Sequence, residues 1–160
     1  MIAAEPFDSP DVQALVVAQQ EELRGIDGRG DIGPVRVGAM FDPPEGIFLV
    51  ARDRNGHAVA CGGVARFDEA RGELKRMFVR PEARGRGLGR LLLVALETEA
   101  VRLGYAGLVL ETGEQQAAAI GLYVSAGYEP IPCYGPYTGQ AISRCYEKRL
   151  AAAAGDQHPS

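Results

Sequence analysis

A stretch rich in glycine and arginine, residues 84–90 (Arg-Gly-Arg-Gly-Leu-Gly-Arg), has the composition of a phosphate-binding loop. Glycines alternate at positions 85, 87 and 89, so little side-chain bulk prevents the backbone N–H groups from turning toward one point. A helix-like run begins at Leu88, and a helix N-terminus adds unpaired N–H groups and the positive end of its dipole. The three arginines add formal charge around the same concavity. The stretch therefore predicts a site for a multiply charged anion, most simply a pyrophosphate.

Two common phosphate-binding loops do not match these residues. A Walker loop needs Gly, four residues and then Gly-Lys-Ser/Thr, and this spacing does not occur in the sequence. The dinucleotide fingerprint Gly-x-Gly-x-x-Gly fails because Arg90 and Leu92 stand where its third glycine would be needed. On loop composition alone, a plain solvated Gly/Arg turn is the alternative.

The segments on either side of the loop predict a parallel βαβ unit. A strand is expected over residues 73–79 and an amphipathic helix over residues 88–103, with Gly104 as its stop. Residues 107–112 are mostly apolar, as is typical of a strand buried on both faces. Two parallel strands joined by a helix form a right-handed crossover, which places the glycine loop at the end of the first strand.

The other segments predict an antiparallel first half and a short closing half. Ser9 followed by Pro10 is a typical helix start, and we expect its helix to give way to an irregular loop over residues 25–46. The paired glycines Gly62 and Gly63 indicate a bulge or a close backbone approach within a strand. The remaining strands are expected over residues 2–7, 47–52, 58–67, 128–131 and 142–150, and a last helix over residues 115–126.

Length and charge exclude several classes of protein. A chain of 160 residues fits one domain with its own core, and a net charge of −4 argues against a general nucleic-acid binder. No apolar run approaches the length of a membrane span, and the N-terminus does not resemble a signal peptide, so we expect a cytoplasmic protein. Residues 151–160 are expected to form a disordered tail after a domain over residues 1–150.

The cysteines offer no recognisable metal or catalytic pattern. Cys61, Cys133 and Cys145 form neither an even set nor a C-x-x-C pair, which favours a reduced compartment. A catalytic cysteine would need a histidine nearby, but His57 lies in an expected turn and His158 in the tail. We therefore expect no metal site.

Two motifs in the right order resemble the GNAT superfamily of acyl-CoA N-acyltransferases. Arg84, Gly87 and Gly89 fill its acyl-CoA motif, Arg/Gln-x-x-Gly-x-Gly/Ala. Its later motif, Asn-x-x-Ala-x-x-Leu-Tyr followed by Gly-Phe/Tyr, is matched with Gln in place of Asn by Gln116, Ala119, Leu122, Tyr123, Gly127 and Tyr128. The resemblance spans roughly residues 46–150. It implies an α/β (α+β) domain whose mixed sheet has about six or seven strands, with splayed central strands.

Acetyl-CoA is the co-substrate that the resemblance implies. Its pantetheine arm would lie along the backbone of Met77, Phe78 and Val79, and Gln116 and Tyr123 would complete the site. The pyrophosphate would be held by Arg84, Gly85, Arg86, Gly87, Leu88, Gly89 and Arg90.

The implied chemistry is direct transfer of an acetyl group to an amine, which needs a base for the proton of the amine. Glu73 is the first candidate, because its offset of eleven residues before Arg84 resembles that of the catalytic glutamate in the histone-acetylating branch. An ion pair of Glu73 with Lys75 or Arg76 is the alternative, and Glu111 is the second candidate base. A backbone N–H near Val79 would stabilise the oxyanion.

Tyr123 is the expected acid for the departing thiolate, and an ordinary half-buried aromatic is the alternative. Tyr134 and Tyr137 are expected to touch the acceptor. Glu21 and Glu22 belong either to a solvated helix face or to the lip of the acceptor site.

Three functions remain open at this point. The first is an N-acetyltransferase acting on a small amine, an amino acid or a peptide, and the second is an acyl-CoA sensor without turnover. The third is an interaction domain that uses the arginines, which the overall charge disfavours. The expected partners are acetyl-CoA and the acceptor amine, with a homodimer as an option and without nucleic acid or membrane.

Overall fold

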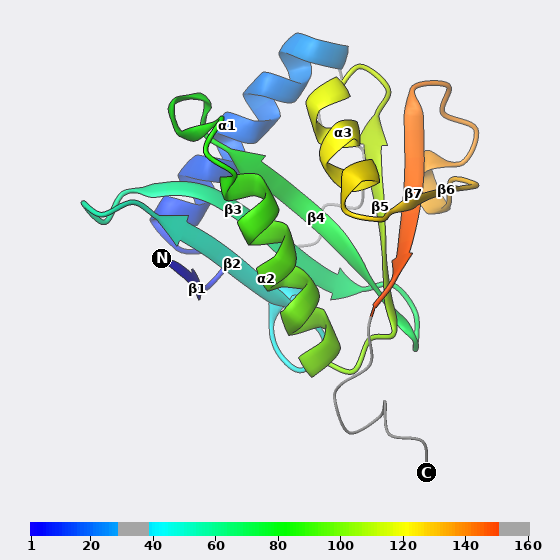
Figure 1. Cartoon of the computed structure of the whole chain (residues 1–160), viewed down its shortest axis with the longest axis horizontal. Coiled ribbons are helices and arrows are strands. Elements are labelled where there is room, and N and C mark those ends of the chain that lie inside the picture. The colour runs from blue at the N-terminus through cyan, green and yellow to red at the C-terminus, as the bar shows by residue number, and fades with distance from the viewer. Residues whose placement is uncertain (29–38, 151–160) are drawn as a thin grey trace.

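In the computed structural model, which describes residues 1–28 and 39–150, seven strands form one mixed sheet in the order β1-β2-β3-β4-β5-β7-β6 (Figure 1). Only β4 and β5 pair in parallel, and the other neighbours are antiparallel. The strands are β1 (Ile2–Ala4), β2 (Ile47–Arg52), β3 (Ala58–Arg66), β4 (Arg71–Val79), β5 (Gly107–Gly113), β6 (Glu129–Ile131) and β7 (Ser143–Arg149). The predicted mixed sheet, with an antiparallel first half and one parallel βαβ unit, is confirmed.

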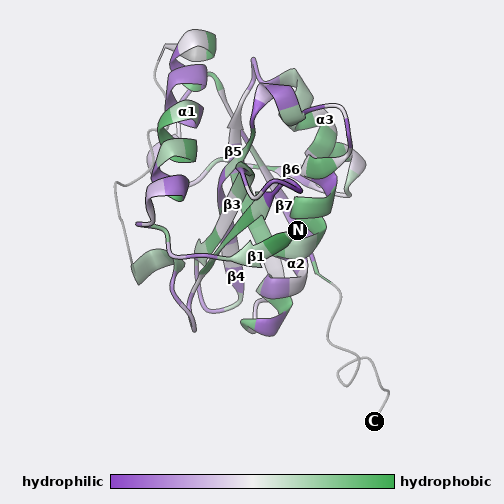
Figure 2. Ribbon diagram, turned by 90° about the vertical axis from the view of Figure 1, so that its left-hand side faces the viewer, coloured by the Kyte–Doolittle hydropathy of each residue, from purple (hydrophilic) through white to green (hydrophobic). Residues whose placement is uncertain are grey.

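Helices cover both faces of this sheet. Helix α1 (Pro10–Asp27) packs on one face, and α2 (Leu88–Arg102) and α3 (Ala117–Ser125) pack on the other (Figures 1 and 2). Each face has its own cluster of buried side chains, with Val12 and Leu15 of α1 on one side and Leu92 and Leu96 of α2 on the other. Among the described residues there are also three short 3-10 turns: Ala39–Phe41, Pro81–Ala83 and Gly135–Tyr137.

Helix α1 begins as the sequence predicts and ends later. The Ser9 side chain accepts a hydrogen bond from the backbone N–H of Val12, and Pro10 occupies the first turn. The helix continues through Gly25, where we expected a loop, and stops before Gly28, whose φ is +79°. These extra residues bring the last turns of α1 toward the glycine loop. Residues 29–38 of the expected loop lie outside the described residues.

The two central strands separate partway along their length. β4 and β5 pair only from Arg71 opposite Gly107 to Glu73 opposite Val109. Beyond Glu73, β4 continues to Val79 without a partner on that side, so an opening forms between the strands. The splayed central strands that the resemblance implies are therefore present.

A bulge in β4 faces a close approach in β3. The two residue steps of β3 from Cys61 to Gly63 lie opposite three residue steps of β4, from Phe78 to Lys75. Arg76, inside this step, has a φ of +62°. A Cβ on Gly62 would lie 2.7 Å from the Met77 sulfur, so a side chain there would collide. Gly62 thus marks a close approach of β3 to the Met77 side chain, and the extra residue of the bulge lies in β4.

Cys133 and Cys145 form a disulfide with their Cα atoms 5.1 Å apart, so the expectation of reduced cysteines is wrong for this pair. Ile131 of β6 lies opposite Cys145 of β7, and this pairing brings Cys133, two residues further on, beside it. The register of β6 on β7 brings the two cysteines together, and the spacing of the cysteines in the sequence does not reveal this pairing. Cys61 stays free and buried, and its burial raises the pKa of its thiol to about 12.

The C-terminal tail that we expected over residues 151–160 lies outside the described residues. Within residues 1–28 and 39–150, no helix is both long and apolar enough to cross a membrane.

Candidate active site

The glycine loop joins the 3-10 turn after β4 to the first turn of α2. Gly85 and Gly87 have φ values of +80° and +77°, which L-residues with side chains rarely adopt. Gly87 is also the N-cap of α2, so the loop leads directly into the N–H groups that begin this helix. Gly89 differs: a Cβ there would lie 3.5 Å from Leu122, which is an ordinary contact. Backbone conformation therefore demands glycine at two positions of the loop, and Gly89 is only a small residue against α3.

A cavity of about 790 Å³ lies beside this loop. Its walls come from α1, from the end of β4, from the loop with the start of α2, and from the first half and the Leu122-Tyr123 step of α3. The predicted cofactor residues among its lining are Met77, Phe78, Val79, Arg84, Gly85, Gly87, Leu88, Gly89, Arg90, Gln116 and Tyr123. Arg86, predicted with them, is exposed and is not part of this lining.

The end of β4 turns its backbone toward the opening. Arg80 N–H donates to the Val59 carbonyl at 2.8 Å, next to the pair formed by Ala60 and Val79. In an antiparallel ladder this makes Ala60 and Val79 a non-hydrogen-bonded pair, so the N–H and C=O of Val79 point away from β3. The Val79 carbonyl accepts a hydrogen bond from Nε of Arg84 at 2.8 Å. The Val79 N–H therefore points to the side of β4 on which β4 has no paired strand at this position.

Helix α1 contributes to the cavity through residues that the sequence did not single out for it. Glu22 and Ile26, one turn apart, line it. Both carboxylate oxygens of Glu22 accept from Nη2 of Arg84, at 2.7 and 2.9 Å. We had expected Glu22 on a solvated face or at the acceptor lip, and it lies against the glycine loop. The spacing of Glu22 and Ile26 on one helix face is the sequence signal for this wall. It was missed because we expected the helix to end before Ile26.

Two further contacts hold these walls in place. The side-chain amide of Gln19 donates to the Met77 carbonyl at 3.0 Å and so ties α1 to the bulged part of β4. The Arg90 guanidinium donates to Ser125 Oγ and so ties the first turn of α2 to the last turn of α3.

Tyr123 stands in the α3 wall of the cavity. Its side chain is buried, and burial raises the pKa of its phenol above the ordinary value. Its ring packs edge-on against Tyr128 with centroids 5.8 Å apart. A phenol with a raised pKa keeps its proton at neutral pH, as an acid in this position must.

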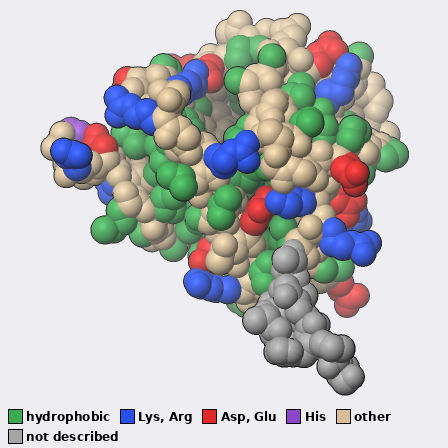
Figure 3. Space-filling view, viewed as in Figure 1, with side chains coloured by type: hydrophobic (Ala, Val, Ile, Leu, Met, Phe, Trp, Pro, Cys, Tyr) green, Lys and Arg blue, Asp and Glu red, His purple; other side chains and the backbone are tan. Residues whose placement is uncertain are grey.

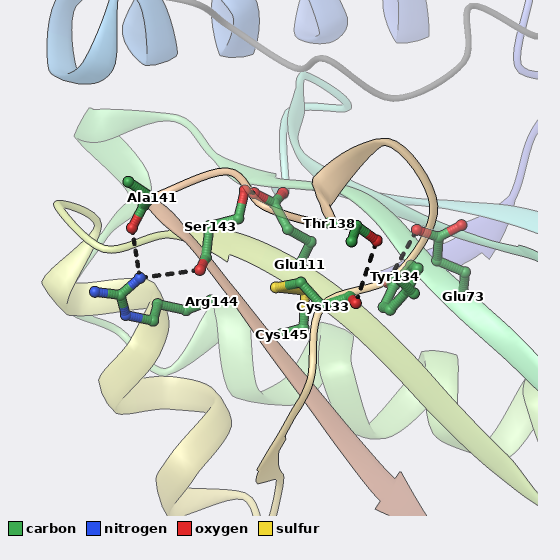
Figure 4. The surroundings of a disulfide bond; sticks show 9 residues. All are labelled: Glu73, Glu111, Cys133, Tyr134, Thr138, Ala141, Ser143, Arg144 and Cys145. Atoms are coloured by element: carbon green, nitrogen blue, oxygen red, sulfur yellow. Dashed lines mark hydrogen bonds between the residues drawn. A yellow bond between two sulfur atoms is a disulfide. The ribbon is translucent and has the colours of Figure 1, made fainter.

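Glu73 and Glu111 lie outside the lining of this cavity. Leu74 and Leu110 belong to the cluster under α2, so the alternating residues Glu73 and Glu111 face the other side of the sheet. Glu73 accepts a hydrogen bond from the Tyr134 hydroxyl at 3.0 Å, and Glu111 accepts one from the Ser143 hydroxyl at 2.7 Å (Figure 4).

A buried lysine accompanies Glu73. The ammonium of Lys75, whose side chain is only 4% exposed, lies 3.8 Å from Glu73 and donates to the Tyr137 hydroxyl at 3.4 Å. The ion pair that we considered for Glu73 and Lys75 is thus present, and it is long. The loop residues Tyr134 and Tyr137 contact the two charged residues of β4, so this loop packs against the face of the sheet that Glu73 and Lys75 share.

Two further observations concern the surface charge and the residues that could bind a metal ion. On the face shown in Figure 3, Lys and Arg side chains are interspersed with Asp and Glu. Among the described residues, no group of three or more His, Cys, Asp or Glu side chains is arranged to hold a metal ion.

Comparison with known proteins agrees with this geometry. The model of the acetyltransferase (GNAT) family matches residues 12–128. A protein of Azospirillum brasilense named IAA acetyltransferase is 42% identical over 149 residues, which is 89% of this chain and 95% of that protein. The sequence similarity to this family therefore extends beyond the glycine-loop motif and the Leu-Tyr motif.

Solved structures share the fold. A Klebsiella pneumoniae structure, assigned as an acyl-CoA N-acyltransferase, superposes with a TM-score of 0.81 at 32% identity, over 94% of this chain and 97% of its own. A GNAT acetyltransferase of Elizabethkingia anophelis, solved with acetyl-CoA bound, has a TM-score of 0.64 at 17% identity, over 94% and 97% of the two chains. The family match covers most of the chain, and this protein belongs to the GNAT family of acetyltransferases.

Proposed function

We propose that this protein transfers the acetyl group of acetyl-CoA to a primary amine of a small molecule, an amino acid or a peptide. The observation that supports this most strongly is the cavity beside the glycine loop, which is also lined by the end of β4 at Met77, Phe78 and Val79. Its volume of about 790 Å³ lies within the range of small-molecule sites. Gly85, Gly87 and the first turn of α2 supply the donors for a pyrophosphate at one end, and Tyr123 stands toward the other.

The roles of the residues follow from the two faces of the sheet. The donor substrate would occupy the cavity, with its amide-bearing arm along the backbone of Met77 and Val79. The acceptor amine would enter from the side of Glu73 and Glu111, where a carboxylate can take its proton. The Val79 N–H would stabilise the negative charge that develops on the carbonyl oxygen, and Tyr123 would protonate the departing thiolate.

Between the two carboxylates, we propose Glu73 as the base. It borders the point where β4 and β5 separate, since its pairing with Val109 is the last between them. Glu111 lies two residues beyond Val109 on β5 but accepts a hydrogen bond from Ser143, and it remains the second candidate.

The experiment is a panel of amines assayed with acetyl-CoA, read by release of the free thiol and by the mass of the acetylated product. The panel includes amino acids, small polyamines and peptides, and IAA, the compound in the name of the Azospirillum relative, is assayed beside them. Acetylation of an amine, slowed about 10- to 1,000-fold in Tyr123→Phe, is the expected result. An acyl-CoA sensor would instead be stabilised by acetyl-CoA and release no thiol with any member of the panel.

A cytoplasmic location and a homodimeric state are further parts of the proposal. Fractionation of the source cells tests the first, and light scattering of the purified protein tests the second.

A further inference from the structure

We propose that the Cys133–Cys145 disulfide positions Tyr134, and that Tyr134 orients the Glu73 carboxylate and keeps it ionised for proton abstraction. This inference rests on the proposed function, because it concerns the residue that we assign as base. Tyr134 is a positioning residue in this scheme, and the disulfide is the anchor of the loop that carries it.

The disulfide connects the surroundings of the two candidate carboxylates. Cys145 of β7 is directly opposite Glu111 of β5, and Cys133 immediately precedes Tyr134, whose hydroxyl donates to Oε2 of Glu73 (Figure 4). One covalent bond thus connects β7, the strand that flanks Glu111, to Cys133, the residue just before the one that contacts Glu73. The first loop residue after this bond is the one that reaches the proposed base.

Weaker contacts, from Phe67 before β4 and from the rest of the loop, also hold Tyr134. Its ring packs edge-on against Phe67, with centroids 4.8 Å apart, and against Tyr137, with centroids 5.6 Å apart. Thr138 Oγ1 donates to the Cys133 carbonyl at 3.4 Å, near the upper limit for a hydrogen bond. One 3-10 turn, Gly135–Tyr137, is the regular structure between Cys133 and β7. The covalent bond is therefore the strongest restraint on this segment.

The surroundings of Tyr134 make its hydroxyl a hydrogen-bond donor that keeps its proton, not an acid that gives the proton up. Burial, Glu73 and Glu111 all raise the pKa of the Tyr134 phenol, so it stays protonated at neutral pH. A protonated phenol can only stabilise the charged form of a carboxylate that accepts its hydrogen bond. Lys75, at 3.8 Å, acts on Glu73 in the same direction, and Tyr137 faces both Lys75 and Tyr134.

Loss of the disulfide should act on Glu73 through the loop. A closed loop of this length samples fewer conformations than the open one, so the open loop holds Tyr134 against Glu73 for a smaller fraction of the time. Glu73 would then be protonated at a higher pH. At low pH the enzyme would lose turnover, and at high pH it would lose little.

The test compares Tyr134→Phe, Cys133→Ser and the double variant with the unmodified protein. Cys133→Ser is chosen because Cys133 is half-buried, whereas Cys145 is 3% exposed and less tolerant of change. Tyr105→Phe is the matched control, since it removes a tyrosine hydroxyl bonded to the Glu45 carbonyl, outside the proposed site. Circular dichroism confirms that each variant is folded, and Cys145→Ser replaces Cys133→Ser if that variant is not.

The first readout does not depend on activity. NMR of protein with ¹³C-labelled glutamate side chains follows the titration of Glu73, whose signal is identified by its loss in Glu73→Gln. We expect the midpoint to rise by about one pH unit in Tyr134→Phe and by less in Cys133→Ser. The double variant should exceed Tyr134→Phe by little, because the two changes act through one contact. Tyr105→Phe should leave the midpoint in place.

Two outcomes would overturn the inference. One is an unchanged Glu73 midpoint in folded Tyr134→Phe or in the folded cysteine variant. The other is alkylation of three cysteines, rather than Cys61 alone, in the denatured protein before any reductant is added.

The second readout is the pH dependence of kcat/KM with an accepted amine. Its acidic limb should move with the Glu73 midpoint in every variant. If the midpoint moves and the protein acetylates no amine, the positioning is right and the proposed function is wrong. If the protein turns over, and the acidic limb of kcat/KM stays in place while the titration midpoint of Glu73 moves, then Glu73 is not the base. The inference then fails as stated.

Discussion

Arg84 and Glu22 form a close ion pair although 62 residues separate them in the sequence, with Nη2 of Arg84 within 3 Å of both carboxylate oxygens. The pair joins the last turns of α1 to the glycine loop at the wall of the cavity. Its side chains are 44% and 34% exposed, so the attraction is screened by water and contributes little to stability. A bound phosphate would compete with Glu22 for Arg84, and the carboxylate would repel it.

Glu22→Gln should therefore tighten the binding of acetyl-CoA. Removal of one negative charge from the wall of an anion site should lower the Kd about two- to five-fold at low ionic strength, and by less in high salt. Calorimetric titration at two salt concentrations measures the effect. Glu21→Gln is the control, because Glu21 is exposed and is not part of the lining. Weaker binding by Glu22→Gln would mean that the ion pair preorganises Arg84 for the ligand.

Gly87→Glu should abolish the binding of acetyl-CoA. The backbone φ of +77° strains any side chain at this position, and a carboxylate there would repel the pyrophosphate. Acetyl-CoA should raise the Tm of the unmodified protein and leave that of Gly87→Glu unchanged. Gly89→Ala is the matched control and should keep the Tm shift, because a methyl group at this position makes only an ordinary contact with Leu122. A normal Tm shift in Gly87→Glu would contradict the role of this loop.

The elements closest to the motifs were the ones that the sequence predicted best. The strand before the loop, the helix after Gly87 and the next strand follow from local periodicity and glycine placement, and β4, α2 and β5 match them within two residues at each end. The opening between β4 and β5 came from the family resemblance. Its extent depends on where pairing ends after Glu73, which is a property of the whole sheet.

Contacts between distant segments could not be predicted in this way. The ion pair of Glu22 with Arg84 and the disulfide of Cys133 with Cys145 depend on how α1 docks and on how β6 pairs with β7. Neither relation leaves a periodic pattern in the sequence. Gly25 also misled the reading of α1, because a glycine inside a helix costs only about 1 kcal/mol and packing can override it.

Glu73→Gln should lower turnover mainly at low pH. There the amine is almost wholly protonated and depends on a base, whereas at high pH a larger share is already neutral. We expect a loss of about 100-fold at pH 6.5 that shrinks as the pH approaches the pKa of the amine. The pH profile of kcat/KM with one amine measures this. An equal loss at every pH would assign Glu73 a structural role beside Lys75, and Glu111→Gln is the parallel variant for the second candidate.

Tyr123→Phe should reduce turnover without reducing affinity for acetyl-CoA. The phenylalanine keeps the edge-on contact with Tyr128 and the wall of the cavity, and only the proton donor is lost. A loss of about 10- to 1,000-fold in kcat is expected when the chemical step limits the rate, with little change in the Kd of acetyl-CoA.

The environment of Tyr123 also fixes the direction of its pH dependence. Burial raises the pKa of the phenol, so the acid form persists as the pH rises, and no alkaline limb below pH ~10 should come from this residue. Tyr128→Phe is the matched control: its hydroxyl donates to Glu97 at 2.8 Å, so its loss should lower stability by about 1–3 kcal/mol and leave turnover nearly unchanged. Both variants should be measured in one assay with an amine whose chemical step limits the rate. Normal turnover by Tyr123→Phe would remove this residue as the acid, and the thiolate would then have to leave unassisted or with a proton from water.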